Sequence, residues 1–434
     1  MVEQKYYLYL GKDEKEFFSL PEAWTVSHFV EAEENGPLPS IEQMVLDALS
    51  QPAGTDPLAH LISKANHIAI IVDDATRPTP VAPILKTLLS HIEAGDFKKD
   101  NISIVIALGT HEVMQINALE ARLGSNIVAQ YRVIQHNAWQ SDLVTVIIPG
   151  DTRVLKINPE VARADLRIGI SSILPHPMAG YGGGPKIVMP GVVNYEFIRD
   201  HHMKHLIHPR STAGLTEGNP FHEDCMRAAR ANGLDFSINC VYDQKGQITS
   251  IIGGSLEMAF RKAVEICLAK LGHQFEEKVD ITIASAYPHS HGHQFFKGLS
   301  TPDAVTKDAG AILLVAPIMA PISTEFINSF HIIKEKSHNN SATYIKEHLA
   351  KGTAYLPDKS IDFNMAMSTP FLRPKIRTIL VSSLISENEA HTMGLEYAAN
   401  VEEGLKLLEA AYTKATVAIF PAGGLIVPIT AWER

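Results

Sequence analysis

The stretch that decides the fold is His67-Ile68-Ala69-Ile70-Ile71-Val72-Asp73-Asp74-Ala75-Thr76-Arg77-Pro78-Thr79-Pro80. Its first part, His67–Val72, is a continuous apolar run, which is typical of a strand buried on both faces of a parallel sheet. Its second part is a polar turn with two prolines that leads into a helical pattern. A buried strand followed by a polar turn and a helix is the repeating unit of layered α/β folds.

The same unit recurs along the chain. Apolar runs that end in polar or Gly/Pro residues occur at Ile102–Leu108, Leu166–Ile173, Ile281–Ala284, Ile312–Ala316, Ile376–Val381 and Thr416–Phe420. Helical patterns lie between them, including Val193–His208 and Leu256–Leu271. The alternation predicts an α/β fold of two domains with mostly parallel sheets.

The length of 434 residues favours two domains, because single hydrophobic cores stop growing near about 250–300 residues. The polar stretch between Gly272 and Val279 separates a helix from a new strand. We therefore expect a first domain over residues 1–273 and a second over residues 280–400. The pattern leaves open which of the two domains the last strand, Thr416–Phe420, joins.

Composition and charge narrow the class of protein. With 45% hydrophobic residues, the chain has enough apolar surface for sizeable cores. Acidic residues outnumber basic ones by 48 to 38, which gives no overall electrostatic footprint for nucleic acid or an anionic membrane. Three cysteines make no disulfide framework, and no targeting segment is recognised, so the cytoplasm is the expected compartment. The 20 histidines are unusual, because histidine titrates near neutrality and binds metals.

Candidate functional residues follow the apolar runs, because ligands of open α/β sheets bind beyond the carboxyl ends of the strands. After the first run, Asp74 and Arg77 lie in the proline-rich turn, and an arginine at a helix start suits a carboxylate or phosphate. The alternative is a capped turn whose aspartates only accept backbone hydrogen bonds. After the second run, His111 is either a general acid/base or a helix-entry residue.

A glycine-rich loop follows the third apolar run, from Leu174 to Lys186. It contains three consecutive glycines, Gly182, Gly183 and Gly184. Glycines let a backbone approach a ligand closely, and Lys186 supplies a cation or an amine nucleophile. The loop is neither a Walker A motif nor a dinucleotide fingerprint. A flexible lid is the alternative, although a lid has little need for His176 or for the terminal lysine.

Two further segments are rich in histidine. One is the helical pattern that carries His201, His202, His205 and His208. His201 and His205 are four residues apart on one face, as two zinc ligands would be, and a polar helix face is the alternative.

The other segment runs from Tyr287 to Gly298. It contains alternating histidines, His289, His291 and His293, which are either metal ligands or solvent-facing loop residues. Gln294 and Lys297 are spaced to share one face at a helix start, where they could bind an anion.

Taken together, these motifs resemble the nickel-dependent lactate racemase family. The resemblance rests on the turn at 73–80, the Gly-Thr-His at 109–111, the His-Pro…Gly-Tyr-Gly-Gly-Gly-Pro-Lys run at 176–186, a histidine sixteen residues beyond that lysine, and the Gln-x-x-Lys at 294–297. The elements occur in family order across most of the chain, and the glycine–lysine run is the most specific of them.

The resemblance implies a nickel-pincer nucleotide, which is a pyridinium mononucleotide with two sulfur donors. The implied cofactor residues are Lys186 as the covalent attachment, His202 as the nickel ligand, and Asp74, Gly182, Gly183 and Gly184 around the nucleotide. The implied catalytic residues are His111 and His176, and the implied substrate-binding residues are Arg77, Gln294, Lys297 and His293. The resemblance also implies an active site in the cleft between two domains, and a C-terminal segment, 408–434, that rejoins the first domain.

The implied reaction is inversion of C2 in a 2-hydroxy acid. Proton removal would ionise a weak carbon acid beside a carboxylate, whereas hydride removal gives a planar 2-keto acid that accepts hydride on either face. Two bases, His111 and His176, would serve the two enantiomers, and Arg77 and Lys297 would hold the carboxylate. His293 stands where the family has an aromatic residue near the substrate, so malate or an aldonic acid joins lactate as a candidate.

Two other classes of protein stay open. One is a zinc hydrolase that uses His201 and His205, and the other is a non-catalytic protein that binds the nickel cofactor without turnover. In the racemase interpretation the chain depends on other proteins for synthesis and loading of the cofactor, and the sequence leaves a homo-oligomer open.

Overall fold

The computed structural model describes residues 4–31 and 35–432, which fold into two compact units. Unit 1 contains Met1–Glu33, Gln244–Gly246 and Leu271–Arg434. Unit 2 contains Glu34–Asp243 and Gln247–Lys270. All seven strands predicted from the apolar runs are present, and both units are built around mostly parallel sheets, so the predicted fold class is confirmed.

Unit 2 is a six-stranded sheet in the order β13-β12-β9-β4-β5-β6. Its strands are β4 (Ile68–Asp73), β5 (Ile102–Ala107), β6 (Arg132–Gln135), β9 (Leu166–Ile173), β12 (Phe236–Tyr242) and β13 (Ile248–Gly254). All neighbours are parallel except β12 and β13, which pair antiparallel at one edge. Every residue of β4 and β12 is buried, and in β4 this explains the continuous apolar run from Ile68 to Val72.

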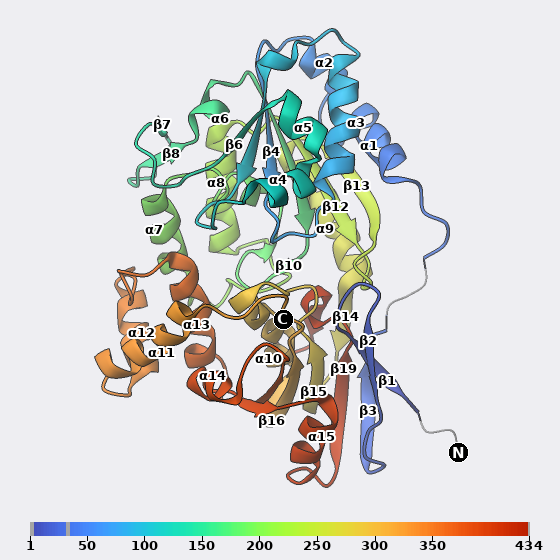
Figure 1. The fold of residues 1–434 in the computed structure, drawn as a ribbon, viewed down its shortest axis with the longest axis vertical. Coiled ribbons are helices and arrows are strands. Elements are labelled where there is room, and N and C mark those ends of the chain that lie inside the picture. The colour runs from blue at the N-terminus through green and yellow to red at the C-terminus, as the bar shows by residue number, and fades with distance from the viewer. Residues whose placement is uncertain (1–3, 32–34, 433–434) are drawn as a thin grey trace. The chain divides into compact units, whose positions relative to one another are not determined.

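Helices cover both faces of this sheet, with α1 and α3 on one side and α6 and α8 on the other (Figure 1). The helices of unit 2 are α1 (Ile41–Ser50), α2 (Leu58–Ile62), α3 (Val81–Glu93), α4 (Ile116–Leu123), α5 (Ser125–Gln130), α6 (Pro159–Arg163), α7 (Tyr195–His205), α8 (Pro220–Asn232) and α9 (Leu256–Leu271). Short pieces complete it: β7 (Val144–Val146), β8 (Leu155–Ile157), β10 (Pro175–His176), β11 (Gly180–Tyr181), η1 (Lys99–Asn101) and the 3-10 turn η2 (Gly184–Ile187).

The chain order of the strands places a topological switch between β4 and β9. From β4 the chain adds β5 and β6 on one side, and it then returns to add β9 and β12 on the other. Loops diverge at such a point, and ligands of open α/β sheets bind there beyond the carboxyl ends of the strands. The turn after β4 and the glycine-rich loop after β9 therefore begin at neighbouring positions.

Unit 1 holds a second parallel sheet, in the order β18-β17-β16-β15-β19-β3. Its strands are β3 (Trp24–Phe29), β15 (Val279–Ser285), β16 (Thr306–Val315), β17 (Arg377–Val381), β18 (Glu396–Ala398) and β19 (Ala415–Phe420). Its helices are α10 (Ser300–Val305), α11 (Thr324–Lys336), α12 (Ser341–Ala350), α13 (Ile361–Leu372), α14 (Glu387–Thr392) and α15 (Val401–Glu409). The remaining pieces are β1 (Tyr6–Tyr9), β2 (Lys15–Phe18), β14 (Gly272–Phe275), β20 (Val427–Thr430), η3 (Gly292–Leu299) and η4 (Gly423–Leu425).

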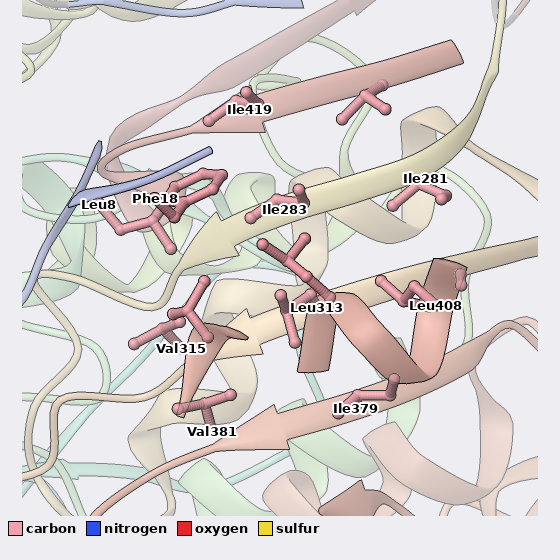
Figure 2. Packing of buried hydrophobic residues seen from close by; sticks show 14 of the residues in the cluster. Leu8, Phe18, Ile281, Ile283, Leu313, Val315, Ile379, Val381, Leu408 and Ile419 are labelled. Atoms are coloured by element: carbon pink, nitrogen blue, oxygen red, sulfur yellow. The ribbon is translucent and has the colours of Figure 1, made fainter. Parts of the chain in front are cut away.

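The core of unit 1 lies between this sheet, the hairpin β1–β2 and the helix α15. Figure 2 shows branched side chains of four adjacent strands, among them Ile283, Leu313 and Ile379, packed against Leu8 of β1 and Leu408 of α15. Each of these five residues is fully buried. Burying a side chain of this size contributes roughly 1.5–3 kcal/mol, so the hairpin and the helix are held mainly by apolar contact.

The structure corrects the predicted course of the two chain ends. The C-terminal strand β19 pairs with β15 and β3 in the sheet of unit 1, so the prediction that residues 408–434 rejoin the N-terminal domain is wrong. It is instead the N-terminal strand β3 that joins the sheet of the C-terminal unit, where β19 offers it a parallel edge. The main change of unit lies between Lys270 and Leu271, slightly before the expected boundary at 272–279.

Among the described residues, no helix is both long and apolar enough to cross a membrane.

Candidate active site

The candidate residues of unit 2 follow three strands around its topological switch. Asp74 and Arg77 come directly after β4, His111 follows β5, and His176 and Lys186 follow β9. Because β9 and β5 flank β4 in the sheet, the three loops leave the same sheet edge side by side. The sheet therefore brings together residues that are up to 112 positions apart in the sequence.

Asp74, which is buried, forms a close pair with the half-buried His111. Nδ1 of His111 lies 2.5 Å from Oδ2 of Asp74, and the hydroxyl of Thr76 donates to the other carboxylate oxygen at 2.6 Å. Burial alone would raise the pKa of Asp74, but the hydrogen bond and charge of His111, together with Arg77, outweigh it and hold that pKa well below its usual range. Asp74 is therefore ionised at neutral pH, and Nδ1 of His111 carries the hydrogen that it donates.

The contact with His111 was not part of the role predicted for Asp74 at the nucleotide, and that role stays a prediction. The resemblance placed Asp74 at the nucleotide, whereas the structure commits both of its carboxylate oxygens to protein partners. An ionised carboxylate that accepts from Nδ1 fixes the tautomer of the imidazole and leaves the lone pair on Nε2. Asp74 therefore orients the ring of His111 with the lone pair on Nε2, and the acid/base role of His111 stays a prediction.

Arg122, in α4, was missed by the sequence analysis and holds the turn after β4. Its guanidinium pairs with the carboxylate of Asp73 and donates to the carbonyl oxygens of Asp73 (3.2 Å), Arg77 (3.0 Å) and Thr79 (2.7 Å). Asp73 also accepts from the hydroxyl of Thr79 at 2.6 Å. No signal in the local sequence marks Arg122, because it reaches the turn from a helix more than 40 residues further along.

Replacement of Arg122 by methionine is expected to lower the free energy of unfolding by about 3–5 kcal/mol, because Asp73 would keep a buried charge without its partner. Urea denaturation measures the change. The matched control is Lys406→Met, since Lys406 pairs with Glu402 on an exposed face of α15 and its loss is expected to leave the free energy of unfolding nearly unchanged. Equal losses in the two variants would contradict a clamping role for Arg122.

The side chain of Arg77 is half-buried in the same turn. Within residues 4–31 and 35–432, its guanidinium makes no hydrogen bond or ion pair, although Asp73 and Asp74 lie near enough to feel its charge. A guanidinium presents a planar set of donors that matches a carboxylate or a phosphate. Its placement is consistent with the predicted role in binding an anion.

His176 lies in the two-residue strand β10 and bends the loop back on itself. Its Nδ1 accepts hydrogen bonds from the backbone N–H groups of Met178 (3.2 Å) and Ala179 (3.1 Å). Phe221 of α8 lies at its ring face, with centroids 6.1 Å apart. The ring is thus fixed by both backbone and packing, which a freely moving lid would not require.

At two of the three positions of the glycine run, backbone conformation and close packing explain why the residue is glycine. Gly183 and Gly184 have φ values of +69° and +50°, and a Cβ on Gly184 would lie 2.2 Å from the ring of Phe260. Their missing side chains face the protein, so these two glycines serve the close packing of the loop on β9 and α9. Gly182 alone has ordinary space around its Cβ position, with the nearest atom 3.7 Å away.

Gly184→Ala is therefore expected to destabilise the protein by about 2 kcal/mol or more, because both its backbone conformation and the contact with Phe260 oppose a side chain. Gly182→Ala is the matched control and is expected to leave stability within about 0.5 kcal/mol of wild type. Thermal denaturation of the two variants provides the comparison. A Gly184→Ala protein as stable as the Gly182→Ala protein would refute this account.

Lys186 is enclosed in η2 between the sheet and α8. Its Nζ lies 4.8 Å from the ring centroid of Phe221. Burial lowers the pKa of its ammonium, and the charge of Arg77 lowers it further. Within the described chain, Nζ forms no ion pair. An amine with a lowered pKa is a better nucleophile at neutral pH, as the predicted covalent attachment requires.

His222, at the start of α8, is a second residue that the sequence analysis missed. It is buried, its ring stacks on Phe260 with centroids 5.1 Å apart, and no hydrogen bond to its Nδ1 occurs among the described residues. Burial and the charge of Lys186 lower the pKa of His222 to about 4. A neutral imidazole thus borders the lysine, and only the fold could reveal it.

His202 is buried on α7. Its Nδ1 donates to the carbonyl oxygen of Ile198 at 2.8 Å, which leaves the lone pair on Nε2 and makes Nε2 the ring atom able to ligate a metal. His201 beside it donates from Nε2 to the carbonyl oxygen of Phe221 at 3.0 Å. Burial and the charges of its two histidine neighbours keep the pKa of His201 well below its usual value, so it is neutral.

The zinc alternative has a geometric basis, because ligand atoms of His201, His205 and Asp224 lie within 4.8 Å of one another. Asp224, however, accepts from Nε2 of His205 (3.0 Å) and pairs with Arg153 (2.8 Å) and Arg227 (2.6 Å). Two guanidinium groups at one carboxylate repel a divalent cation. The cluster is thus better described as a buried ion-pair network than as a zinc site.

Gln294, Lys297 and His293 lie in η3 of unit 1, after β15. The ring of His293 stacks on Phe326 of α11, with centroids 4.8 Å apart and planes at 15°. Oε1 of Gln294 is buried and accepts no hydrogen bond from the described residues. Because these residues belong to the other unit, their predicted role at the substrate stays a prediction.

Comparisons with known proteins find relatives in one family. Residues 10–214 match the lactate racemase N-terminal domain. The lactate racemase of Thermoanaerobacterium thermosaccharolyticum is 32% identical over 283 residues, and that of Lactiplantibacillus plantarum is 31% identical over 286 residues. Each alignment covers 64% of this chain and 66% of the relative, just under two thirds of its length.

Solved structures extend the likeness over the whole chain. The lactate racemase apoprotein from Thermoanaerobacterium thermosaccharolyticum has a TM-score of 0.86 at 25% identity and covers 98% of this chain and 100% of its own. A crystal structure of a Thermotoga maritima protein, at 19% identity and a TM-score of 0.66, covers 92% of this chain and 100% of its own and shares the fold.

Fold and site together define a two-unit α/β protein that carries a histidine–aspartate pair and an enclosed lysine at the switch point of a parallel sheet. The chain is similar over almost its whole length to proteins of the lactate racemase family.

Proposed function

We propose that this protein is a 2-hydroxy-acid racemase or epimerase that inverts C2 through a 2-keto acid, with lactate as the first candidate substrate. The observation that carries the proposal is the Asp74–His111 pair, at 2.5 Å, beside an enclosed Lys186 at the sheet switch point. The named lactate racemases among its relatives support the reaction class.

The residues fit the nickel-pincer nucleotide that the family resemblance implies. Lys186 has the enclosed, readily deprotonated amine needed for a covalent bond, and His202 has its ring lone pair on Nε2. The Gly182 backbone and the Arg77 guanidinium supply close approach and positive charge for a nucleotide phosphate or a substrate carboxylate. When bound, this cofactor would supply a group that accepts hydride from C2 and returns it.

Residues of this chain would bind the carboxylate and hydroxyl oxygens of the substrate. Arg77 would bind the carboxylate, so that the 2-keto acid stays in place until hydride returns. His111 and His176 would contact the hydroxyl group, where a proton must leave as the carbonyl forms. His293 and the other histidines of the Tyr287–Gly298 segment would contact the substituent on C2, which keeps malate and aldonic acids as candidates.

Substrate screening on protein produced with the cofactor-synthesis proteins tests the proposal. Each enantiomer of lactate, malate and a set of aldonic acids is incubated with loaded protein, and the opposite stereoisomer is measured by chiral chromatography. We expect inversion of at least one acid. When that acid is supplied with deuterium at C2, we expect the product to retain part of the deuterium. A chain that binds cofactor but inverts none of these acids would instead be a non-catalytic binding protein.

The partners and compartment follow from this function. Loading requires proteins that synthesise the nucleotide and deliver nickel, and we propose transient contact with them in the cytoplasm. The zinc hydrolase alternative predicts stoichiometric zinc and an unmodified Lys186, which metal analysis and intact mass distinguish in one preparation.

A further inference from the structure

The rings of His201 and His202 on α7 approach each other through their Nδ1 atoms, which lie 3.3 Å apart. Nε2 of His201 lies 3.0 Å from the carbonyl oxygen of Phe221. Nδ1 of His202 lies 2.8 Å from the carbonyl oxygen of Ile198, one turn earlier in the same helix. Because a carbonyl oxygen only accepts, both of these ring nitrogens carry hydrogen. In a neutral His201, Nδ1 therefore presents its lone pair to the N–H of His202.

The opposite arrangement of hydrogen on His201 is unfavourable for two reasons. A hydrogen on its Nδ1 would set two N–H groups against each other across 3.3 Å. Moving the hydrogen there would also remove the donor to the carbonyl oxygen of Phe221, a buried hydrogen bond. The N–H of His202 is thus shared between two acceptors, the carbonyl oxygen of Ile198 and, at the longer distance, the ring of His201.

Packing fixes the ring of His201 as well. His201 and Phe221 are both fully buried. The ring centroid of Phe221 lies 4.3 Å from that of His201 and 5.0 Å from that of His202. The same ring lies 4.8 Å from Nζ of Lys186. His201 therefore connects the ring of His202 to α8, the helix that also borders the lysine.

We propose that His201 is a positioning residue for a nickel ion bound by His202, whose ring it holds in the tautomer and orientation that let Nε2 ligate the metal. The inference rests on the function proposed above, in which His202 is the nickel ligand. A ligating histidine donates its other ring N–H to an acceptor, which fixes the ring and raises the basicity of the ligating nitrogen. Here one such acceptor is a second histidine, whose own hydrogen is held by the backbone of α8.

Two substitutions separate the two nitrogens of His201. In His201→Gln the amide nitrogen lies near the position of Nε2 and can donate to the carbonyl oxygen of Phe221, but the acceptor for His202 is lost. In His201→Asn the amide oxygen lies near the position of Nδ1 and can accept from His202, but the bond to Phe221 is lost. We expect His201→Asn to unfold at a lower urea concentration than His201→Gln, because it leaves a buried carbonyl oxygen without this donor.

Nickel retention is expected to follow the opposite order. Protein produced with the cofactor-synthesis proteins is incubated with excess EDTA, and the nickel that remains is measured over time by elemental analysis. We expect His201→Gln to lose nickel about 10–100-fold faster than wild type, and His201→Asn to stay within about threefold of wild type. Intact mass shows that the adduct on Lys186 persists, so that the loss concerns nickel alone. A loaded His201→Gln protein that retains nickel as long as wild type, or a folded His201→Asn protein that loses it as fast as His201→Gln, would overturn the proposal.

A second measurement needs no cofactor. Nitrogen-15 NMR of the full chain, labelled at histidine, distinguishes the two ring nitrogens, and spectra of His201→Gln and His202→Gln assign the signals. We expect a protonated Nε2 in His201 and a protonated Nδ1 in His202. A protonated Nδ1 in His201 would overturn the positioning role, whatever the activity. A loaded wild-type chain that inverts no acid would instead overturn the proposed function, and the nickel retention of the two variants would still test His201.

Discussion

Lys186→Ala is expected to yield a folded protein that retains no covalently bound cofactor and no activity. The reason is chemical, because a covalent bond to the cofactor needs an unprotonated amine, and Lys186 is an enclosed amine beside Arg77 whose pKa is lowered by burial. Removal of the side chain deletes the nucleophile without breaking an ion pair. Intact mass and nickel content, measured after production with the cofactor-synthesis proteins, report the loss directly.

Two further variants test whether the loss of cofactor is specific to the amine of Lys186. Lys186→Arg keeps a positive charge but offers no amine of ordinary basicity, so it is expected to lose the mass adduct as completely as alanine does. Lys204→Ala removes an exposed lysine from α7 and is expected to load like wild type. A mass adduct that persists in Lys186→Ala, or is located on another residue, would refute Lys186 as the attachment point.

The fold was predictable to the extent that buried strands are continuous apolar runs. All seven predicted strands are present, because a strand covered on both faces consists mainly of apolar residues. The course of the chain ends was not predictable in this way. β3 is only partly buried, so its sequence lacks the apolar run, and its pairing with β19 is a contact across almost the whole chain.

The candidate site was predictable where a residue acts from the loop that contains it. His111, His176 and Lys186 each follow a strand, and topology alone brings their loops together. Arg122 and His222 come from helices that reach the site from elsewhere in the sequence, and nothing near them marks their role. The tautomers of His111 and His176 could not be predicted from the sequence either, because they depend on hydrogen bonds and not on residue type.

Asp74→Asn is expected to lower kcat by about 10³–10⁴-fold with little change in fold. An amide cannot supply the negative charge that stabilises protonated His111, and its N–H₂ group favours the tautomer in which Nδ1 of His111 accepts. Nε2 would then carry hydrogen and could not take a proton from the substrate. Single-turnover rates on loaded protein give the effect on chemistry, and intact mass verifies loading. A variant that retains more than about a tenth of wild-type kcat would contradict the pairing of Asp74 with His111 as the proton-transfer unit.

The same variant has a signature in the pH dependence of stability. The pKa of Asp74 is lower in the folded chain than in the unfolded one, so its ionised form stabilises the fold above a pH of about 4, and this contribution is lost as the pH falls through the folded pKa. We expect the stability difference between wild type and Asp74→Asn to shrink as the pH falls below about 4. Urea denaturation at pH 3.5 and pH 7 measures it. A difference that grows on acidification would mean that Asp74 is protonated in the native state, and a neutral carboxyl group could not stabilise the imidazolium form of His111 by its charge.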